Sequence, residues 1–195
     1  LQRQQLFTTS DANEQLPKVV AAKKRLLEID PKCTVYTYLQ HVDAQLAAYF
    51  AERVDVLIDA TDNFETRLLI NDISYQTGIP WVHGACVGSS GVVFPFRPGE
   101  TACFRCLLPV LPSLNETCDT AGIIAPAVQV TAALQSAEVL KFLTGNVDAL
   151  RQKVHHFDVW HNTTMDIGVQ KIRNLHCDSC SEKATYPALQ VNAEQ

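Results

Sequence analysis

The chain has 195 residues, of which 47% are hydrophobic and 19% are charged, as is typical of a packed globular protein. This length predicts one domain, or one domain with a small appendage. The 16 basic and 21 acidic residues give a formal net charge of −5, which argues against a broad nucleic-acid surface. No apolar run reaches the roughly 18 residues of a membrane span, and the N-terminus lacks a signal-peptide core. We therefore expect a cytoplasmic protein that acts neither on nucleic acid nor in a membrane.

Helices and strands alternate along the first half of the predicted chain. Pro17 suits the start of a helix, Asp43 can cap a second one, and Gly78 can close a third. Apolar residues with strand-like spacing lie between these helices. In chain order, we expect helix 17–30, strand 33–39, helix 44–54, strand 54–58, helix 64–78, strand 79–87 and strand 91–96.

The second half is predicted to contain one long helix and a terminal pair of strands. Residues 121–145 are rich in alanine and branched apolar residues and end at Gly145, so we expect a long buried helix. Residues 154–160 and 165–172 resemble two neighbouring strands. Together with the alternation before them, they predict an α/β protein with a parallel sheet, helical crossovers and a C-terminal antiparallel extension.

Four of the seven cysteines form two C-x-x-C pairs, and these give the strongest local signal in the sequence. Each pair can place two thiolates on one tight turn, and two such turns complete a closed tetrahedral zinc site. Such a site would tie the C-terminal tail to the body of the protein. The alternatives are unrelated free thiols or a redox pair, although neither pair has a clear thioredoxin-like context. The predicted ligands are Cys103, Cys106, Cys177 and Cys180.

Two aspartates, Asp59 and Asp62, follow the predicted strand 54–58. Ligands bind beyond the carboxyl ends of strands in parallel sheets, and carboxylates there can hold Mg²⁺ and nucleotide phosphates. Arg3, Lys18 and Arg67 are basic groups that could neutralise the remaining phosphate charge. Asp-x-x-Asp alone is a weak signal, because turns and helix caps are rich in Asp. The eight glycines contain no G-x-G-x-x-G phosphate loop.

The other three cysteines have different settings. Cys118 lies in the segment NETCDTAG before the long predicted helix, where a thiol can have a lowered pKa and act as a nucleophile. An incidental thiol is the alternative at this position. Cys33 and Cys86 lie in predicted apolar strands, so we expect both to be inert core residues.

Seven segments, in this order along the chain, carry a resemblance: LQRQQLF, PKVVAAKKRL, DATDNFETRLLIND, GACVGSSG, CFRCLLP, TCDTAGIIAPAV and HCDSC. Taken together, they resemble the ThiF/MoeB family of adenylating enzymes, which are related to ubiquitin-activating enzymes. FDVWHN and ATYPALQ look most like the thiazole-biosynthesis branch of Gram-positive bacteria. The resemblance implies a single adenylation domain over residues 1–195, built on a Rossmann-like, mostly parallel sheet.

The resemblance also implies a reaction. ATP and the C-terminal Gly-Gly carboxylate of a ubiquitin-like sulfur carrier, ThiS or MoaD, would give an acyl-adenylate and pyrophosphate. Sulfur from a donor protein would then convert the carrier to a thiocarboxylate for thiamine-thiazole or molybdopterin biosynthesis. Catalysis would rest on positioning and on neutralising phosphate charge. The family is usually a homodimer, and the C-terminal resemblance favours ThiS over MoaD.

The family's roles carry over to matching positions in this chain. The ATP phosphates would meet one group of side chains, Mg²⁺ a second and zinc a third, while a loop cysteine would link covalently to the carrier. These positions are Arg3, Gln4 and Lys18 for the phosphates, Asp62 for Mg²⁺ with Asn63 and Arg67 lining the site, Cys103, Cys106, Cys177 and Cys180 for zinc, and Cys118 for the covalent link.

One departure from the family pattern is serious. Family members begin with a strand and a glycine-rich nucleotide loop, which this chain lacks. We therefore expect the chain to be the C-terminal portion of such an enzyme and to be inactive alone. A non-catalytic, zinc-stabilised binding or dimerisation module is the main alternative. A dinucleotide-dependent oxidoreductase is disfavoured because the glycine fingerprint is missing, and a zinc-ribbon nucleic-acid binder because the chain is acidic.

Overall fold

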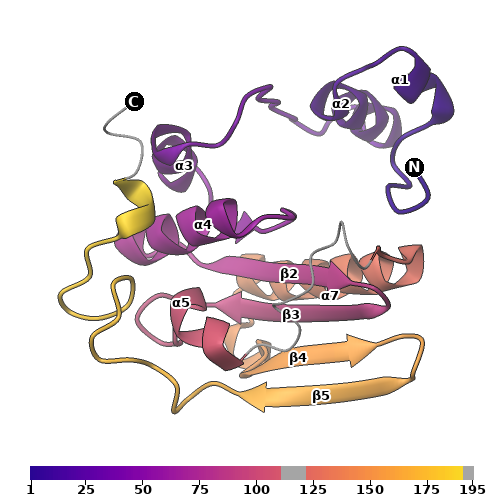
Figure 1. The fold of residues 1–195 in the computed structure, drawn as a ribbon. Helices are drawn as coiled ribbons and strands as arrows, with labels where there is room; N and C mark the ends of the chain where they lie inside the picture. Colours follow the sequence, from indigo (N-terminus) through magenta and orange to yellow (C-terminus); the bar gives the residue numbers. More distant parts are fainter. Residues whose placement is uncertain (111–121, 191–195) are drawn as a thin grey trace. The chain divides into compact units, whose positions relative to one another are not determined.

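The computed structural model describes residues 1–110 and 122–190 and separates the chain into two compact units, residues 1–41 and 42–195 (Figure 1). The N-terminal unit contains α1 (Thr9–Asn13) and α2 (Lys18–Ile29). Thr8 and Asp11 form a capping box at the start of α1, and Pro17 precedes α2. The helix predicted from Pro17 onward is therefore confirmed.

The strand predicted over residues 33–39 is wrong. The structure assigns no strand there, and Cys33 is exposed rather than a core residue. Tyr36 and Leu39 are 79% and 72% exposed. An alternating pattern is stabilised by cross-strand neighbours, and no described strand pairs with this segment.

Capping residues define both helices that open the larger unit. Asp43 accepts a hydrogen bond from the Leu46 backbone N–H at 2.8 Å and begins α3 (Ala44–Ala51). Asn63 accepts one from Thr66 N–H, also at 2.8 Å, and begins α4 (Phe64–Thr77). Gly78 ends α4 with φ of 81°, which is the left-handed conformation that glycine adopts readily. Both helices were predicted.

The sheet has five strands in the order β1-β2-β3-β4-β5. Among these described strands only β1 and β2 are parallel, so the prediction of a mostly parallel sheet is wrong and the sheet is mixed. The physical reason is the length of the connections. Only residues 88 and 89 join β2 to β3, and so short a link permits only an antiparallel hairpin. The strands are β1 (Leu57–Ile58), β2 (Trp81–Val87), β3 (Ser90–Phe96), β4 (Lys153–Asp158) and β5 (Thr163–Gly168).

Helix α7 (Ala125–Leu143) packs on one face of β2 and β3, and Figure 1 shows it behind these strands. The long helix was expected to be buried, but only one stripe is. This stripe faces the strands, whereas Val130 and Leu140 are 39% and 61% exposed. Two glycines, Gly84 and Gly91, leave room for the stripe against the sheet. The buried residues of α7 are Ala127, Thr131, Gln135 and Glu138.

An aromatic core covers the opposite face of β2 and β3. The rings of Trp81 and Phe96 stack with centroids 4.4 Å apart, and Phe104 from the short helix α5 (Phe104–Leu107) meets Trp81 edge-on. Three 3₁₀ turns complete the described elements: Leu108–Val110, Val147–Ala149 and Pro187–Leu189, the last called η3. Across residues 1–110 and 122–190, no helix combines the length and apolarity needed to cross a bilayer.

Candidate metal centre and strand-end site

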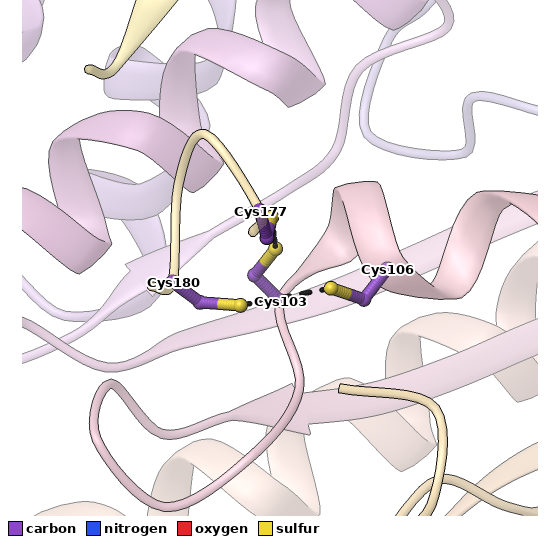
Figure 2. A group of neighbouring side chains, drawn as sticks. All are labelled: Cys103, Cys106, Cys177 and Cys180. Carbon is purple, nitrogen blue, oxygen red and sulfur yellow. Dashed lines mark hydrogen bonds between the residues drawn. The ribbon is translucent and has the colours of Figure 1, made fainter. Parts of the chain in front are cut away.

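The two cysteine pairs lie together in the larger unit. One pair flanks the first turn of α5 and the other lies in the C-terminal tail, and Figure 2 shows all four side chains directed toward one another. The Cys103 and Cys177 sulfurs are 3.4 Å apart, and all four sulfurs lie within 4.8 Å of one another. Zn–S bonds of about 2.3 Å place tetrahedral sulfurs roughly 3.8 Å apart. The arrangement therefore fits a four-coordinate cation.

The four sulfurs lie close to one another and near backbone donors. Backbone N–H groups of Asn174 and Ser179 point at the sulfurs of Cys106 and Cys177, at 3.3 and 3.4 Å. Burial, together with neighbouring thiols, raises the pKa of Cys106 to about 11. A hydrogen bond from Cys103 lowers the pKa of Cys180 to about 5. Like charges crowd here, so a divalent cation would stabilise the fully ionised set.

A second polar cluster lies at the carboxyl end of β1. The Asp59 carboxylate is fully buried, and its Oδ2 accepts hydrogen bonds from His83 Nδ1 at 2.7 Å and Arg67 Nε at 3.2 Å. Its Oδ1 accepts from the backbone N–H and the hydroxyl of Thr61, at 2.9 and 2.7 Å. Arg67 Nη2 also donates to the Thr61 carbonyl at 2.6 Å. Asp59 thus binds the N–H and hydroxyl of Thr61, while Arg67 binds its carbonyl oxygen.

This network separates the roles of the two aspartates. Burial alone would raise the pKa of Asp59, but the hydrogen bond and charge of His83, with the charge of Arg67, hold it below its usual value. Asp62 is exposed and directly follows Thr61, whose backbone is fixed by these hydrogen bonds. Asn63 comes next and caps α4. Asp62 is therefore the carboxylate of this pair that can meet a ligand from solvent.

The other predicted site residues lie in two further places. Arg3 and Lys18 are exposed and Gln4 is half-buried, all in the N-terminal unit, where Lys18 is the first residue of α2. Cys118 lies outside the described residues. Within the larger unit, the structure thus brings together Asp62, Asn63 and Arg67 at one place. At a separate place in the same unit it brings together the four predicted zinc ligands, Cys103, Cys106, Cys177 and Cys180.

His83 is the main member of the strand-end cluster that sequence analysis missed. It lies in an otherwise apolar strand, and nothing in its local pattern indicates a partner. The register could have revealed it, because Ile58 pairs with Val82 and the next residues on the two parallel strands are Asp59 and His83. Only the pairing of β1 with β2 makes them neighbours.

Comparison with known proteins places the chain in a family. The sequence profile of the ThiF family matches residues 1–180. The chain belongs to the ThiF family. The ThiF-family match contains the strand-end cluster and all four clustered cysteines, so both sites belong to the matched region.

Curated relatives of this ThiF-family chain include named adenylyltransferases. It is 41% identical over 183 residues to the sulfur carrier protein ThiS adenylyltransferase of Bacillus subtilis (strain 168), covering 94% of this chain and 54% of that protein. It is 34% identical to the molybdopterin-synthase adenylyltransferase of Escherichia coli (strain K12), covering 93% and 72%. The chain thus spans about half the length of the first of these relatives.

Solved structures confirm the α/β fold of this ThiF-family chain. The crystal structure of E. coli MccB aligns with a TM-score of 0.75 at 21% identity, covering 94% of this chain and 55% of MccB. The structure of E. coli MccB with ATP aligns with a TM-score of 0.74 at 20% identity, covering 93% and 55%. At these identities the likeness concerns the fold.

Proposed function

We propose that this chain is part of an enzyme that uses ATP to adenylate the C-terminal glycine of a ubiquitin-like sulfur carrier protein. The observation that carries the proposal is the 41% identity, over 94% of the chain, to a protein named as a ThiS adenylyltransferase. The same chain is 34% identical to a molybdopterin-synthase adenylyltransferase, so MoaD is the second candidate carrier. The higher identity favours ThiS.

In the proposed reaction, the carrier's terminal carboxylate attacks the α-phosphorus of ATP and pyrophosphate leaves. The product is a carrier acyl-adenylate, whose AMP leaving group makes the carbonyl open to attack by sulfur. The enzyme's task is to hold two anions together, so positioned positive charge and correct orientation supply most of the rate. We assign Arg3, Gln4 and Lys18 to the phosphates of ATP.

The strand-end cluster supplies the second part of the proposed site. Asp62 would bind Mg²⁺, which neutralises phosphate charge when bound. Asn63 would line the site at the start of α4. Arg67 would act by holding the loop, because two of its nitrogens are already bonded to Asp59 and Thr61. Cys118 is proposed to form the covalent link to the carrier during sulfur transfer.

We further propose a structural zinc ion at the four cysteines. The support is the donor set, four sulfurs within 4.8 Å of one another, and the two N–H groups directed at them. Bound zinc would tie the C-terminal tail to α5. A reducing cytoplasm would keep these thiols available, and we propose it as the compartment.

The proposal extends to assembly. Residues 1–195 would form part of one adenylation domain that works as a homodimer, with the sulfur carrier and a sulfur-donor protein as partners.

Carrier-dependent ATP–pyrophosphate exchange tests the function. ThiS and MoaD are offered separately to the 195-residue chain and to a version preceded by the glycine-rich segment that the family resemblance implies. We expect exchange with the extended version, faster with ThiS than with MoaD. Absence of exchange with both carriers, in extended protein that is folded and zinc-loaded, would favour the non-catalytic binding module instead.

Asp62→Asn in the extended version tests the assignment of the site. We expect the exchange rate to fall by about 10²- to 10³-fold, because a charged group placed against developing phosphate charge is lost. Asp55→Asn is the matched control, since Asp55 is another exposed aspartate beside β1. Equal exchange rates for the two variants would remove Asp62 from the proposed site. The proposed function itself would still be decided by the exchange experiment with ThiS and MoaD.

A further inference from the structure

Asp72, on the buried side of α4, lies at the centre of a network that reaches both cysteine pairs. Its carboxylate is fully buried. Oδ2 accepts from Arg105 Nη2 at 2.8 Å, and Oδ1 accepts from Arg105 Nε at 3.2 Å and from Asn71 Nδ2 at 3.0 Å. The hydroxyl of Ser179 donates to the same Oδ1 at 2.5 Å. Neither Asp72 nor its partners were singled out from the sequence.

Arg105 and Ser179 occupy equivalent places in the two pairs. Each is the third residue of its C-x-x-C sequence, Cys103-Phe-Arg-Cys106 and Cys177-Asp-Ser-Cys180. They also contact each other, because Arg105 Nε donates to Ser179 Oγ at 2.8 Å. Asp72, Arg105 and Ser179 therefore form a closed triangle that joins the two cysteine turns without using a sulfur atom.

A third segment of the chain donates a hydrogen bond to the same carboxylate. The backbone N–H of Ala188, in η3, donates to Asp72 Oδ2 at 2.9 Å. The side chain of Asp72 thus receives donors from α4, from α5 and from two points of the C-terminal tail. A buried carboxylate satisfied by this many donors is held in one orientation, and it holds its donors in turn.

We propose that Asp72 is a positioning residue for the metal centre: it orients both cysteine turns through Arg105 and Ser179, so that four sulfurs converge before a cation binds. This inference rests on the zinc site proposed above and goes beyond it. Groups that orient metal ligands typically change metal affinity by about 10- to 100-fold when they are removed.

The charges support the arrangement. Four thiolates around a divalent cation carry a net charge of −2, and the Arg105 guanidinium lies beside them. An arginine side chain is always cationic in proteins, and the Asp72 carboxylate pairs with this one at 2.8 Å. Asp72 thereby fixes a positive charge next to the anionic cluster.

Zinc affinity of the chain, measured by competition with a chromophoric chelator, tests the inference. For Asp72→Asn we expect a zinc dissociation constant about 10- to 100-fold above that of the unaltered chain. Glu138→Gln is the matched control, because Glu138 is also buried and also bonded to cations, Lys141 and Arg151, but lies on α7. We expect its zinc affinity to be unchanged.

A second pair of variants covers the case in which Asp72→Asn does not fold. Ser179→Ala removes one hydroxyl from the triangle, whereas Ser181→Ala removes one from the same loop without touching Asp72. We expect only the former to weaken zinc binding. Substituted Co²⁺ gives a spectroscopic signature of tetrahedral sulfur coordination, and we expect that signature to be altered only in the triangle variants.

Two results would overturn the inference, and they are distinguishable. Zinc binding by Asp72→Asn or Ser179→Ala as tight as in the matched controls would remove Asp72 from any positioning role while leaving the metal site intact. An unaltered chain that binds neither Zn²⁺ nor Co²⁺ would overturn the metal site and this inference together.

Discussion

Asp59 and Asp62 are three positions apart and have opposite environments. Asp59 points inward to His83 and Arg67, whereas Asp62 is exposed to solvent. A buried carboxylate is stable in its charged form only when donors and cations offset the lost hydration. At Asp59 those donors also fix the Thr61 backbone, so its burial serves the geometry of the loop that ends in Asp62.

The lowered pKa of Asp59 predicts a specific dependence of stability on pH. A carboxyl group with a depressed folded-state pKa stabilises the fold above its unfolded pKa of about 3.9, and this contribution is lost as pH falls through the folded value. We expect Asp59→Asn to lower the free energy of unfolding by about 3–5 kcal/mol at pH 7, with the difference shrinking below about pH 4. Urea unfolding at a series of pH values measures this.

Asp166→Asn serves as the control for Asp59. Asp166 also accepts a hydrogen bond from a histidine, His155 Nδ1 at 2.8 Å, but its side chain is 52% exposed. Water screens such an exposed pair, so we expect Asp166→Asn to change the free energy of unfolding much less than Asp59→Asn does. A difference between Asp59→Asn and the unaltered chain that stays constant from pH 7 to pH 3 would contradict the assignment of a depressed pKa.

At the scale of the element, α7 and the parallel pair β1–β2 are joined by one side chain. Gln135 Nε2 donates to the backbone oxygens of Asp59 and Val82, at 2.7 and 3.2 Å. A Cβ atom at Gly84 would overlap the side-chain amide of Gln135. The glycine therefore leaves space for a polar link between the helix and the ends of two strands.

Gly84→Ala should break this link. The amide of Gln135 is the flexible end of a side chain and can move, but the move takes its donor from the buried Asp59 carbonyl, at a cost of about 1–3 kcal/mol in unfolding free energy. The Val82 carbonyl still accepts from the Asp59 backbone N–H at 3.0 Å. Gly168→Ala is the control, because a Cβ there meets no atom within 4 Å. Chemical denaturation compares the two, and equal stabilities would show that the Gln135 link contributes nothing.

Local signals account for the elements that the sequence predicted correctly. The cap Asp43 and the terminator Gly78 act within a few residues, and each is where the sequence indicated. The strand expected at 33–39 failed because alternation needs a neighbouring strand to become a ladder. The antiparallel C-terminal extension was expected, and the structure confirms it in β4 and β5. The mixed character of the whole sheet was missed because the alternation of helices and strands favoured parallel pairs, whereas among the described strands only β1 and β2 are parallel.

The candidate sites show the same difference: local signals were predictive, and long-range contacts were not. The cysteine spacing indicated a cluster, and the structure confirms that the four sulfurs meet. His83 and Asp72 were missed because the charged partners that define their roles are distant along the chain: Asp59 is 24 positions from His83, and Arg105 is 33 from Asp72. The structural role of such a buried polar residue depends on partners that are distant in sequence, and no periodicity or motif in a single sequence indicates which residues these are.

At the scale of the whole chain, the described tail after β5 is held mainly by side chains. Residues 169–190 contain one 3₁₀ turn and no strand. Arg173 Nη2 donates to the Cys180 carbonyl at 2.8 Å, and the second cysteine pair lies against the first. With so few backbone ladders, the local stability of this segment depends on the cluster.

Removal of the proposed zinc ion by a chelator should therefore loosen the tail selectively. We expect trypsin to cut after Lys171, Arg173 and Lys183 about tenfold faster in the metal-free chain, which corresponds to about 1.4 kcal/mol of local stability. Cleavage after Lys153, in β4, should change little. Mass spectrometry of timed digests measures both rates. Equal acceleration at all four sites would indicate global unfolding, and none would show that metal does not secure the tail.

The separation of the two cysteine pairs has a consequence for biosynthesis. Cys103 and Cys177 are 74 positions apart, so a nascent chain offers one pair long before it can offer the other. A half-site of two thiolates can meet the half-site of another unfinished chain as readily as its own, until folding raises the effective concentration of the second pair. Metal supplied during translation would then favour cross-linked misassembly, whereas metal supplied after release would favour the closed site.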